Sequence, residues 1–170
     1  HGGRCHLHVR RRMSNFTVRA VQRADDPALA KVPALFGTMH AEMAEQGMGQ
    51  RLAPDGGRTW LDGVIGGLER FGRIAVAEWD GEVIGFAHAA VKLAPEHLGG
   101  GRIGHVTHLY VTPAHRRSGI ARALAASLHE WLRTRSVLSI ELQVVHRNEA
   151  GLAFWRSLGY APELLQMRKH

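Results

Sequence analysis

The chain has 170 residues, of which 45% are hydrophobic, and a formal net charge of +7. This length fits one compact domain with a sizeable core, and no apolar run approaches the ~20 residues that a membrane-spanning helix needs. The single cysteine, Cys5, excludes an internal disulfide and favours a reducing compartment such as the cytoplasm.

The first 12 residues differ from the rest of the chain. They contain four arginines and no acidic residue, and no apolar segment follows them. We therefore expect residues 1–12 to be a disordered leader that precedes a single domain of residues 13–170, with Met13 as the native start. Without the leader the charge is +7 less 4, or +3, which suits a small polyanionic ligand and disfavours nucleic acid as a partner.

The first half of the domain is predicted to form a strand, two helices and a hairpin. Residues 16–20 are strand-like, and Asp26-Pro27 begins a helix that reaches Met43, with an interruption at Pro33 left open. Asp55 is placed to cap a second helix over residues 56–69, although internal glycines weaken it. Asp80-Gly81 joins two strand-like runs and is typical of a tight β-hairpin.

The second half of the domain alternates strands with helices. The pattern predicts a strand, an amphipathic helix, a strand, a short helix closed by Gly159 and a last strand, over residues 102–111, 118–134, 137–145, 148–158 and 164–167. A helix between two strands implies a right-handed crossover that leaves those strands parallel. We predict an α/β fold whose mixed sheet has about six to seven strands. Its N-terminal part is antiparallel, 102–111 and 137–145 form the parallel pair, and helices cover both faces.

The most informative segment runs from Leu109 to Ala121. A strand meets a proline-containing turn, and the run Arg116-Arg117-Ser118-Gly119-Ile120-Ala121 then leads into the long helix. The N–H groups at a helix N-terminus have no intrahelical partner, and the helix dipole is positive there. Phosphate suits this arrangement, so we expect residues 116–121 to bind a phosphorylated cofactor.

Two sequence blocks resemble a known family. The first is Leu109-x-Val111-x-Pro113 followed by Arg116-x-x-Gly119-x-Ala121, and the second is Leu142-x-Val144-x-x-x-Asn148 followed by Phe154-Trp155-x-x-Leu158-Gly159-Tyr160. Both blocks, in this order and on the expected elements, resemble the central and closing motifs of the GNAT N-acetyltransferase superfamily. The resemblance covers most of residues 16–167.

This resemblance implies an enzyme that transfers an acetyl group from acetyl-CoA to a primary amine of an unidentified small or peptide acceptor, without a metal. The pantetheine arm would lie between the splayed strands 102–111 and 137–145, bonded to the backbone of Leu109 and Val111. The N–H groups of residues 117–121 would hold the pyrophosphate, with added charge from Arg116 and Arg117. The full cofactor-binding set is then Leu109, Tyr110, Val111, Arg116, Arg117, Ser118, Gly119, Ile120, Ala121, Asn148 and Trp155. Whether the protein forms a homodimer is left open.

The resemblance also suggests a base for the attacking amine. His105 stands where several family members carry a glutamate, and His108 is the second candidate. On a regular strand these two residues face opposite sides, so both can line one site only across a bulge. The same geometry weighs against a shared metal. The position that supplies the family's usual tyrosine acid is Trp155, whose indole is no usable acid, so the general acid stays unassigned and Tyr160 and Tyr110 are weak substitutes.

Simpler interpretations stand beside these. Asn148 is as well explained as a helix N-cap, and Trp155 as a packed aromatic side chain. His105 and His108 can be buried or rim histidines without a catalytic role, and Glu42 a solvated helix face. The alternative function is an acyl-CoA sensor of the same fold that binds without turnover.

Overall fold

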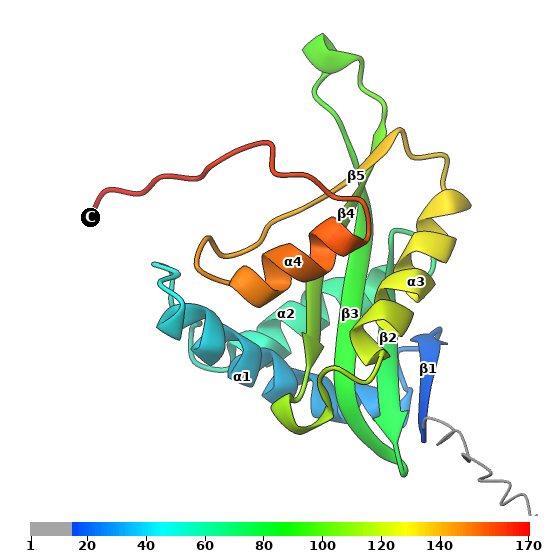
Figure 1. Cartoon of the computed structure of the whole chain (residues 1–170). Coiled ribbons are helices and arrows are strands. Elements are labelled where there is room, and N and C mark those ends of the chain that lie inside the picture. Colours follow the sequence, from blue (N-terminus) through cyan, green and yellow to red (C-terminus); the bar gives the residue numbers. More distant parts are fainter. Residues whose placement is uncertain (1–14) are drawn as a thin grey trace, which may run out of the picture.

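The computed structural model describes residues 15–170, so the expected leader at residues 1–12 lies outside the described residues. One mixed sheet has the strand order β1-β2-β3-β4-β5 (Figure 1). Its five strands are β1 Phe16–Val21, β2 Gly72–Trp79, β3 Glu82–Leu93, β4 Arg102–Val111 and β5 Ser139–Leu142. Neighbours from β1 to β4 pair antiparallel, and β4 pairs parallel with β5. The predicted α/β class and mixed sheet are confirmed.

Helices cover both faces of the sheet, as predicted (Figure 1). The α-helices are α1 Val32–Glu45, α2 Gly56–Val64, α3 Ile120–Arg133 and α4 Glu149–Ser157. Short 3-10 helices are η1 Pro27–Lys31, η2 Ile65–Gly67, η3 Glu96–Leu98 and η4 Pro113–His115. Helices α1 and α2 pack on one face, and α3 packs on the other. Trp155 of α4 packs on the same side as α3.

The sheet has fewer strands than the six to seven predicted. The expected strand at 164–167 does not form, and Leu164, Leu165 and Met167 are between 80% and 90% exposed. A strand needs a paired neighbour and a buried face, and this segment has neither among the described residues. Strand β5 is also shorter than the predicted 137–145, because its pairing with β4 ends at Leu142.

In the first half of the domain, the predicted hairpin turn forms, whereas the predicted cap of the second helix does not. Asp80 and Gly81 both have positive φ angles, 48° and 80°, as the predicted tight hairpin turn requires. Asp55 does not cap α2 through its side chain, because its backbone is left-handed, whereas an N-cap side chain reaches the helix from an extended backbone. Helix α2 ends at Val64 and gives way to η2, whose sequence Ile-Gly-Gly disfavours a continued α-helix.

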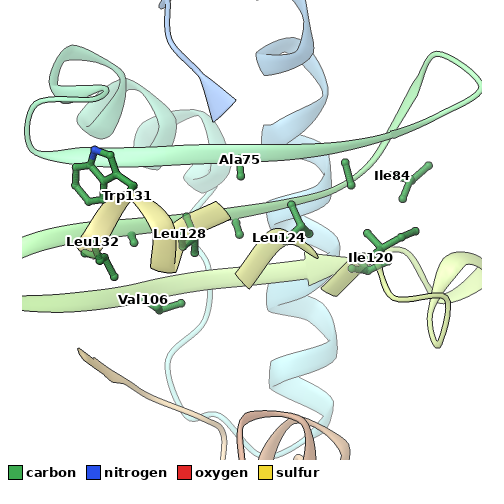
Figure 2. Close-up of a cluster of buried hydrophobic side chains, with 12 residues drawn as sticks. Ala75, Ile84, Val106, Ile120, Leu124, Leu128, Trp131 and Leu132 are labelled. Carbon is green, nitrogen blue, oxygen red and sulfur yellow. The ribbon is translucent and has the colours of Figure 1, made fainter. Parts of the chain in front are cut away.

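The core has two halves, one on each face of the sheet. The α3 cluster is built on leucines four residues apart along the helix, packed against small and branched residues of β2 to β4 (Figure 2). Its labelled members are Ala75, Ile84, Val106, Ile120, Leu124, Leu128, Trp131 and Leu132. The opposite α1/α2 cluster is more aromatic and includes Phe36, Phe86 and Tyr110. Both faces of β4 are therefore covered by packed side chains.

Candidate active site

Strands β4 and β5 separate partway along their length. They pair only from Ile103 with Ser139 to Val106 with Leu142, while β4 continues to Val111. From residue 107 onward the β5 side of β4 therefore has no neighbouring strand among the described residues. This is the splayed parallel pair that the sequence predicted.

The backbone of β4 has a defined orientation at this gap. The N–H of Thr112 donates to the carbonyl of Ile84 in β3 at 2.9 Å. Because hydrogen-bonded pairs alternate along an antiparallel ladder, the N–H and C=O groups of Leu109 and Val111 point away from β3 and toward the gap. In agreement, the Val111 carbonyl accepts a hydrogen bond from Arg116 Nε at 2.9 Å. Leu109 and Val111 thus offer a free strand edge.

The loop before α3 presents a row of free amides. The N–H groups of residues 117–121 donate no hydrogen bond to any described residue. Arg117 and Gly119 have positive φ angles of 60° and 88°, and a Cβ at Gly119 would meet no atom within 4 Å. Glycine is therefore favoured at position 119 by the backbone conformation, and its open side leaves the amides accessible. These amides meet the positive end of the α3 dipole.

A hollow of about 370 Å³ lies at this loop. Its lining residues come from the end of β4, the loop, the first turn of α3 and helix α4: Val111, His115, Arg116, Arg117, Gly119, Ala121, Arg122 and Phe154. Three of these were not singled out from the sequence as cofactor-binding residues: His115, Arg122 and Phe154. Arg122 could have been found from the sequence, because it lies in the first turn of the predicted helix, where an anion would bind.

Helix α4 presents different aromatics to different neighbours. Phe154 lines the hollow, whereas Trp155 packs against the α3 cluster. The Asn148 side chain accepts a hydrogen bond from the Gly151 N–H at 2.9 Å and so caps α4. The two simpler interpretations of Asn148 and Trp155 thus describe their contacts in this structure. Ser118 lies exposed in the loop, and Ile120 is the buried first residue of α3.

The Arg116 side chain is held by hydrogen bonds to other residues of the protein. Its Nη2 lies 3.0 and 2.8 Å from the two carboxylate oxygens of Glu42 in α1, and Nε bonds the Val111 carbonyl. The Tyr110 hydroxyl donates to the same carboxylate at 3.0 Å. Glu42 is therefore a bridge between α1 and the loop and not a solvated face. Arg117 makes no side-chain hydrogen bond to a described residue, so it is freer to meet a ligand than Arg116.

His105 and His108 lie on the same face of the sheet. His88 pairs with His108 and Ala89 pairs with Val106, which leaves Thr107 as the extra residue of a β-bulge. His105 is opposite Ala90, two residues from His88, so both histidines face α1 and α2. The structure thus contains the bulge on which a shared site depended.

These histidines belong to a larger group. Three neighbouring histidines, His40, His88 and His105, each lower the pKa of His108, and His105 also lowers that of His88. Trp60 of α2 packs edge-on against the rings of His88 and His108. Burial lowers the pKa of His88 to about 4 and that of His108 to about 3, so both are neutral near pH 7. Burial, reinforced by Lys92, also lowers the pKa of His105, against the opposing effect of Glu141. Within residues 15–170 no cluster of three or more metal-ligating side chains is present.

Neither tyrosine considered as an acid is suited to that role here. The Tyr160 hydroxyl is 2.7 Å from Nε2 of His129 in α3, and burial raises its pKa to about 12. Burial also raises the pKa of Tyr110, whose hydroxyl is held by Glu42. A phenol of such high pKa is a poor proton donor to a thiolate, whose conjugate acid has a pKa of about 8.5.

The family profile described as "Acetyltransferase (GNAT) family" matches residues 42–160, and the chain belongs to this family. It is 32% identical over 137 residues to a mycothiol acetyltransferase of Amycolatopsis mediterranei, with 80% of this chain and 42% of that protein covered. It is 30% identical over 95 residues to an aminoglycoside N(6′)-acetyltransferase of Klebsiella aerogenes, with 56% of this chain and 61% of that protein covered. The chain thus spans less than two thirds of both relatives.

Solved structures share the fold. An aminoglycoside N-acetyltransferase, AAC(6′)-Iy, in complex with CoA superimposes with a TM-score of 0.71 at 17% identity, covering 94% of this chain and 97% of that one. In residues 15–170 we find no helix with the length and apolar character to cross a membrane.

Proposed function

We propose that the protein transfers an acetyl group from acetyl-CoA to a primary amine. One observation carries this proposal: five consecutive unpartnered amides at the N-terminus of α3 adjoin the free edge of β4. This combination suits a ligand with a diphosphate at one end and an amide-containing arm at the other. Acetyl-CoA is such a ligand.

The cofactor would then be held by three kinds of contact. The amides of residues 117–121 bind the pyrophosphate, and Arg117 and Arg122 add positive charge from the lining of the hollow. The backbone groups of Leu109 and Val111 pair with the pantetheine arm along the gap. Because the Val111 carbonyl already accepts from Arg116, Arg116 either shares this acceptor or gives it up when the arm binds.

The chemistry needs a neutral amine and a stabilised oxyanion. His105 is the proposed base, because its half-buried ring lies on the same face of β4 as His108 and is less deeply buried than that ring. With a pKa of about 3, His108 is a weak base that serves better as a neutral hydrogen-bond acceptor for the incoming amine. The Leu109 N–H, which points into the gap, is the donor proposed for the thioester oxygen as it gains negative charge.

The acceptor is proposed to be a small amine that meets the aromatic α1/α2 face. Glu42, an acid that the structure describes at this end of the site, forms an ion pair with Arg116, so it offers little attraction for a polycation. Two relatives, the aminoglycoside enzyme and a glucosamine 6-phosphate N-acetyltransferase of Trypanosoma brucei brucei, are named for amino-sugar acceptors. Amino sugars therefore belong in any first acceptor screen. A homodimer and a cytoplasmic location stay predictions.

The test is a thiol-release assay with acetyl-CoA and a panel of amines: glucosamine, an aminoglycoside and a peptide with a free N-terminus. We expect free thiol and an acetylated amine to appear together with at least one acceptor. Tight acetyl-CoA binding without thiol release for every amine would favour the sensor function. Absence of acetyl-CoA binding would overturn both.

A further inference from the structure

The bulge in β4 carries a hydroxyl that joins two histidines. Thr107 Oγ1 lies 2.6 Å from Nδ1 of His88 and 2.9 Å from Nδ1 of His108. The same oxygen is 3.3 Å from the His88 backbone carbonyl, to which it can donate. These three contacts converge on one oxygen atom. The proposed chemistry uses His108 as a hydrogen-bond acceptor but gives Thr107 and His88 no role.

The protons at this oxygen can be counted. A threonine hydroxyl has one hydrogen and two lone pairs. A carbonyl can only accept, so the one hydrogen that satisfies it is the hydroxyl hydrogen. Both lone pairs then accept, and each Nδ1 must donate. All three contacts are satisfied when each ring carries a proton on Nδ1. Because burial keeps both rings neutral near pH 7, Nε2 of His88 and of His108 is then bare.

The bulge is what allows this arrangement. On a regular strand, neighbouring residues point to opposite faces, so Thr107 and His108 could not both face α1 and α2. The extra residue in β4 places them on one face, opposite a single partner, His88. His88 is only 4% exposed, and Trp60 packs edge-on against the rings of His88 and His108. Water therefore has little access with which to replace the hydroxyl.

We propose that Thr107 is a positioning residue that fixes His88 and His108 as Nδ1–H tautomers, so that Nε2 of His108 is kept as a hydrogen-bond acceptor. The catalytic consequence rests on the proposed function, since the acceptor amine would approach on this face. The tautomers themselves do not depend on it. The neighbouring ionisable groups are His40 on α1 and His105 on β4, whose effects on His108 disfavour its protonation and so agree with neutral rings.

Nitrogen NMR of the full chain, labelled with 15N in histidine, tests the proposal near pH 7.5. In the wild type we expect both rings in the Nδ1–H form. Thr107→Val keeps the shape but removes the hydroxyl, and we expect at least one ring to change to the Nε2–H form. Thr107→Ser restores the hydroxyl and should restore the wild-type pattern. Thr38→Val, the same change at an exposed site on α1, should leave both rings unaltered.

Either of two results overturns the proposal: a wild-type Nε2–H form at His88 or His108, or unchanged tautomers in Thr107→Val. The wild-type measurement decides even if Thr107→Val fails to fold. Steady-state kinetics adds the functional arm, with an expected loss of about tenfold or more in kcat/KM for Thr107→Val and recovery in Thr107→Ser. If no amine is acetylated, the proposed function fails while the tautomer result stands. If turnover occurs with the wrong tautomers, only the role of Thr107 fails.

Discussion

Strand β4 has two faces with different chemistry. Toward α3 it presents Val106, Leu109 and Val111, which belong to or pack against the α3 cluster. Toward α1 and α2 it presents His105 and His108, with the Thr107 hydroxyl bonded to His108 and to His88 of β3. The α3 face of β4 is therefore apolar, whereas the α1/α2 face carries histidines beside its aromatic cluster. The candidate site is thus built on a strand that packs on both faces, with the histidines of that strand on the α1/α2 side.

The largest expected effect breaks the polar face. His105→Ala should lower kcat/KM for acetyl transfer by about 10²–10⁴-fold near neutral pH, the usual contribution of a general base. The loss should shrink at alkaline pH, where more of the amine is already neutral. Because a base acts in its neutral form and the pKa of His105 is lowered, the acidic limb of the wild-type profile should fall below about pH 6.5.

Thiol-release rates across pH measure this effect, and His97→Ala in exposed η3 is the matched control, which should leave the profile unchanged. A pH profile of the same shape and height in His105→Ala and the wild type would remove His105 from the mechanism.

The next effect breaks the apolar face. Leu128 is fully buried in the α3 cluster, so Leu128→Ala should lower the free energy of unfolding by about 2–5 kcal/mol. The folded fraction should keep its kcat/KM, because the chemistry lies on the opposite face. Urea unfolding compares it with Leu98→Ala, a 69% exposed leucine whose change should stay within about 0.5 kcal/mol. A selective loss of turnover without loss of stability would contradict the division between the faces.

A third expected effect is a dependence of stability on pH that comes from His88 on the polar face. His88 has a pKa of about 4 when folded and an ordinary value of 6.5 when unfolded. As the pH falls from 6.5 to 4, the unfolded chain takes up a proton that the folded chain does not, so stability is lost across this window. The loss should be on the order of 3 kcal/mol.

Urea midpoints measured from pH 7.5 to pH 4.5 should therefore fall more steeply in the wild type than in His88→Leu, which has no proton to gain at this position. Parallel curves for the two proteins would mean that His88 is not held neutral by its surroundings.

The smallest expected effect concerns Tyr160 as a candidate proton donor to the leaving thiolate. Tyr160 is bonded to His129 on α3, and its raised pKa makes it a poor donor. Tyr160→Phe should change kcat by less than about threefold, because the thiolate does not depend on this hydroxyl. A large fall in kcat at unchanged KM would instead assign Tyr160 as the missing acid.

Much of the fold could be predicted because local signals and tertiary packing agree there. The leucine spacing of α3 and the Asp80-Gly81 turn are examples of this agreement. The prediction of a last strand at 164–167 was wrong because strand propensity does not show whether a neighbouring strand is present to pair with it. The side-chain cap by Asp55 was wrong because the left-handed backbone of that residue is set by the turn before it and not by residue type.

The sequence predicted the loop that presents the free amides, but it did not predict the side-chain contacts around the site. The motif around Gly119 located the free amides, since backbone groups at a helix start do not depend on distant side chains. Arg116 forms an ion pair with Glu42, which is far from it in the sequence, so no local sequence pattern predicts this contact. The bulge at Thr107 likewise follows from the register between β3 and β4, which the sequence of β4 alone does not contain.

The central claim is that the amides before α3 bind the diphosphate of acetyl-CoA. Its most direct test is a 15N–1H NMR titration of the backbone amides with CoA. We predict that the largest changes fall on residues 117–121, followed by Leu109 and Val111 along the gap. Saturable changes centred elsewhere, such as the glycine loop at 99–101, with residues 117–121 unmoved, would contradict the account.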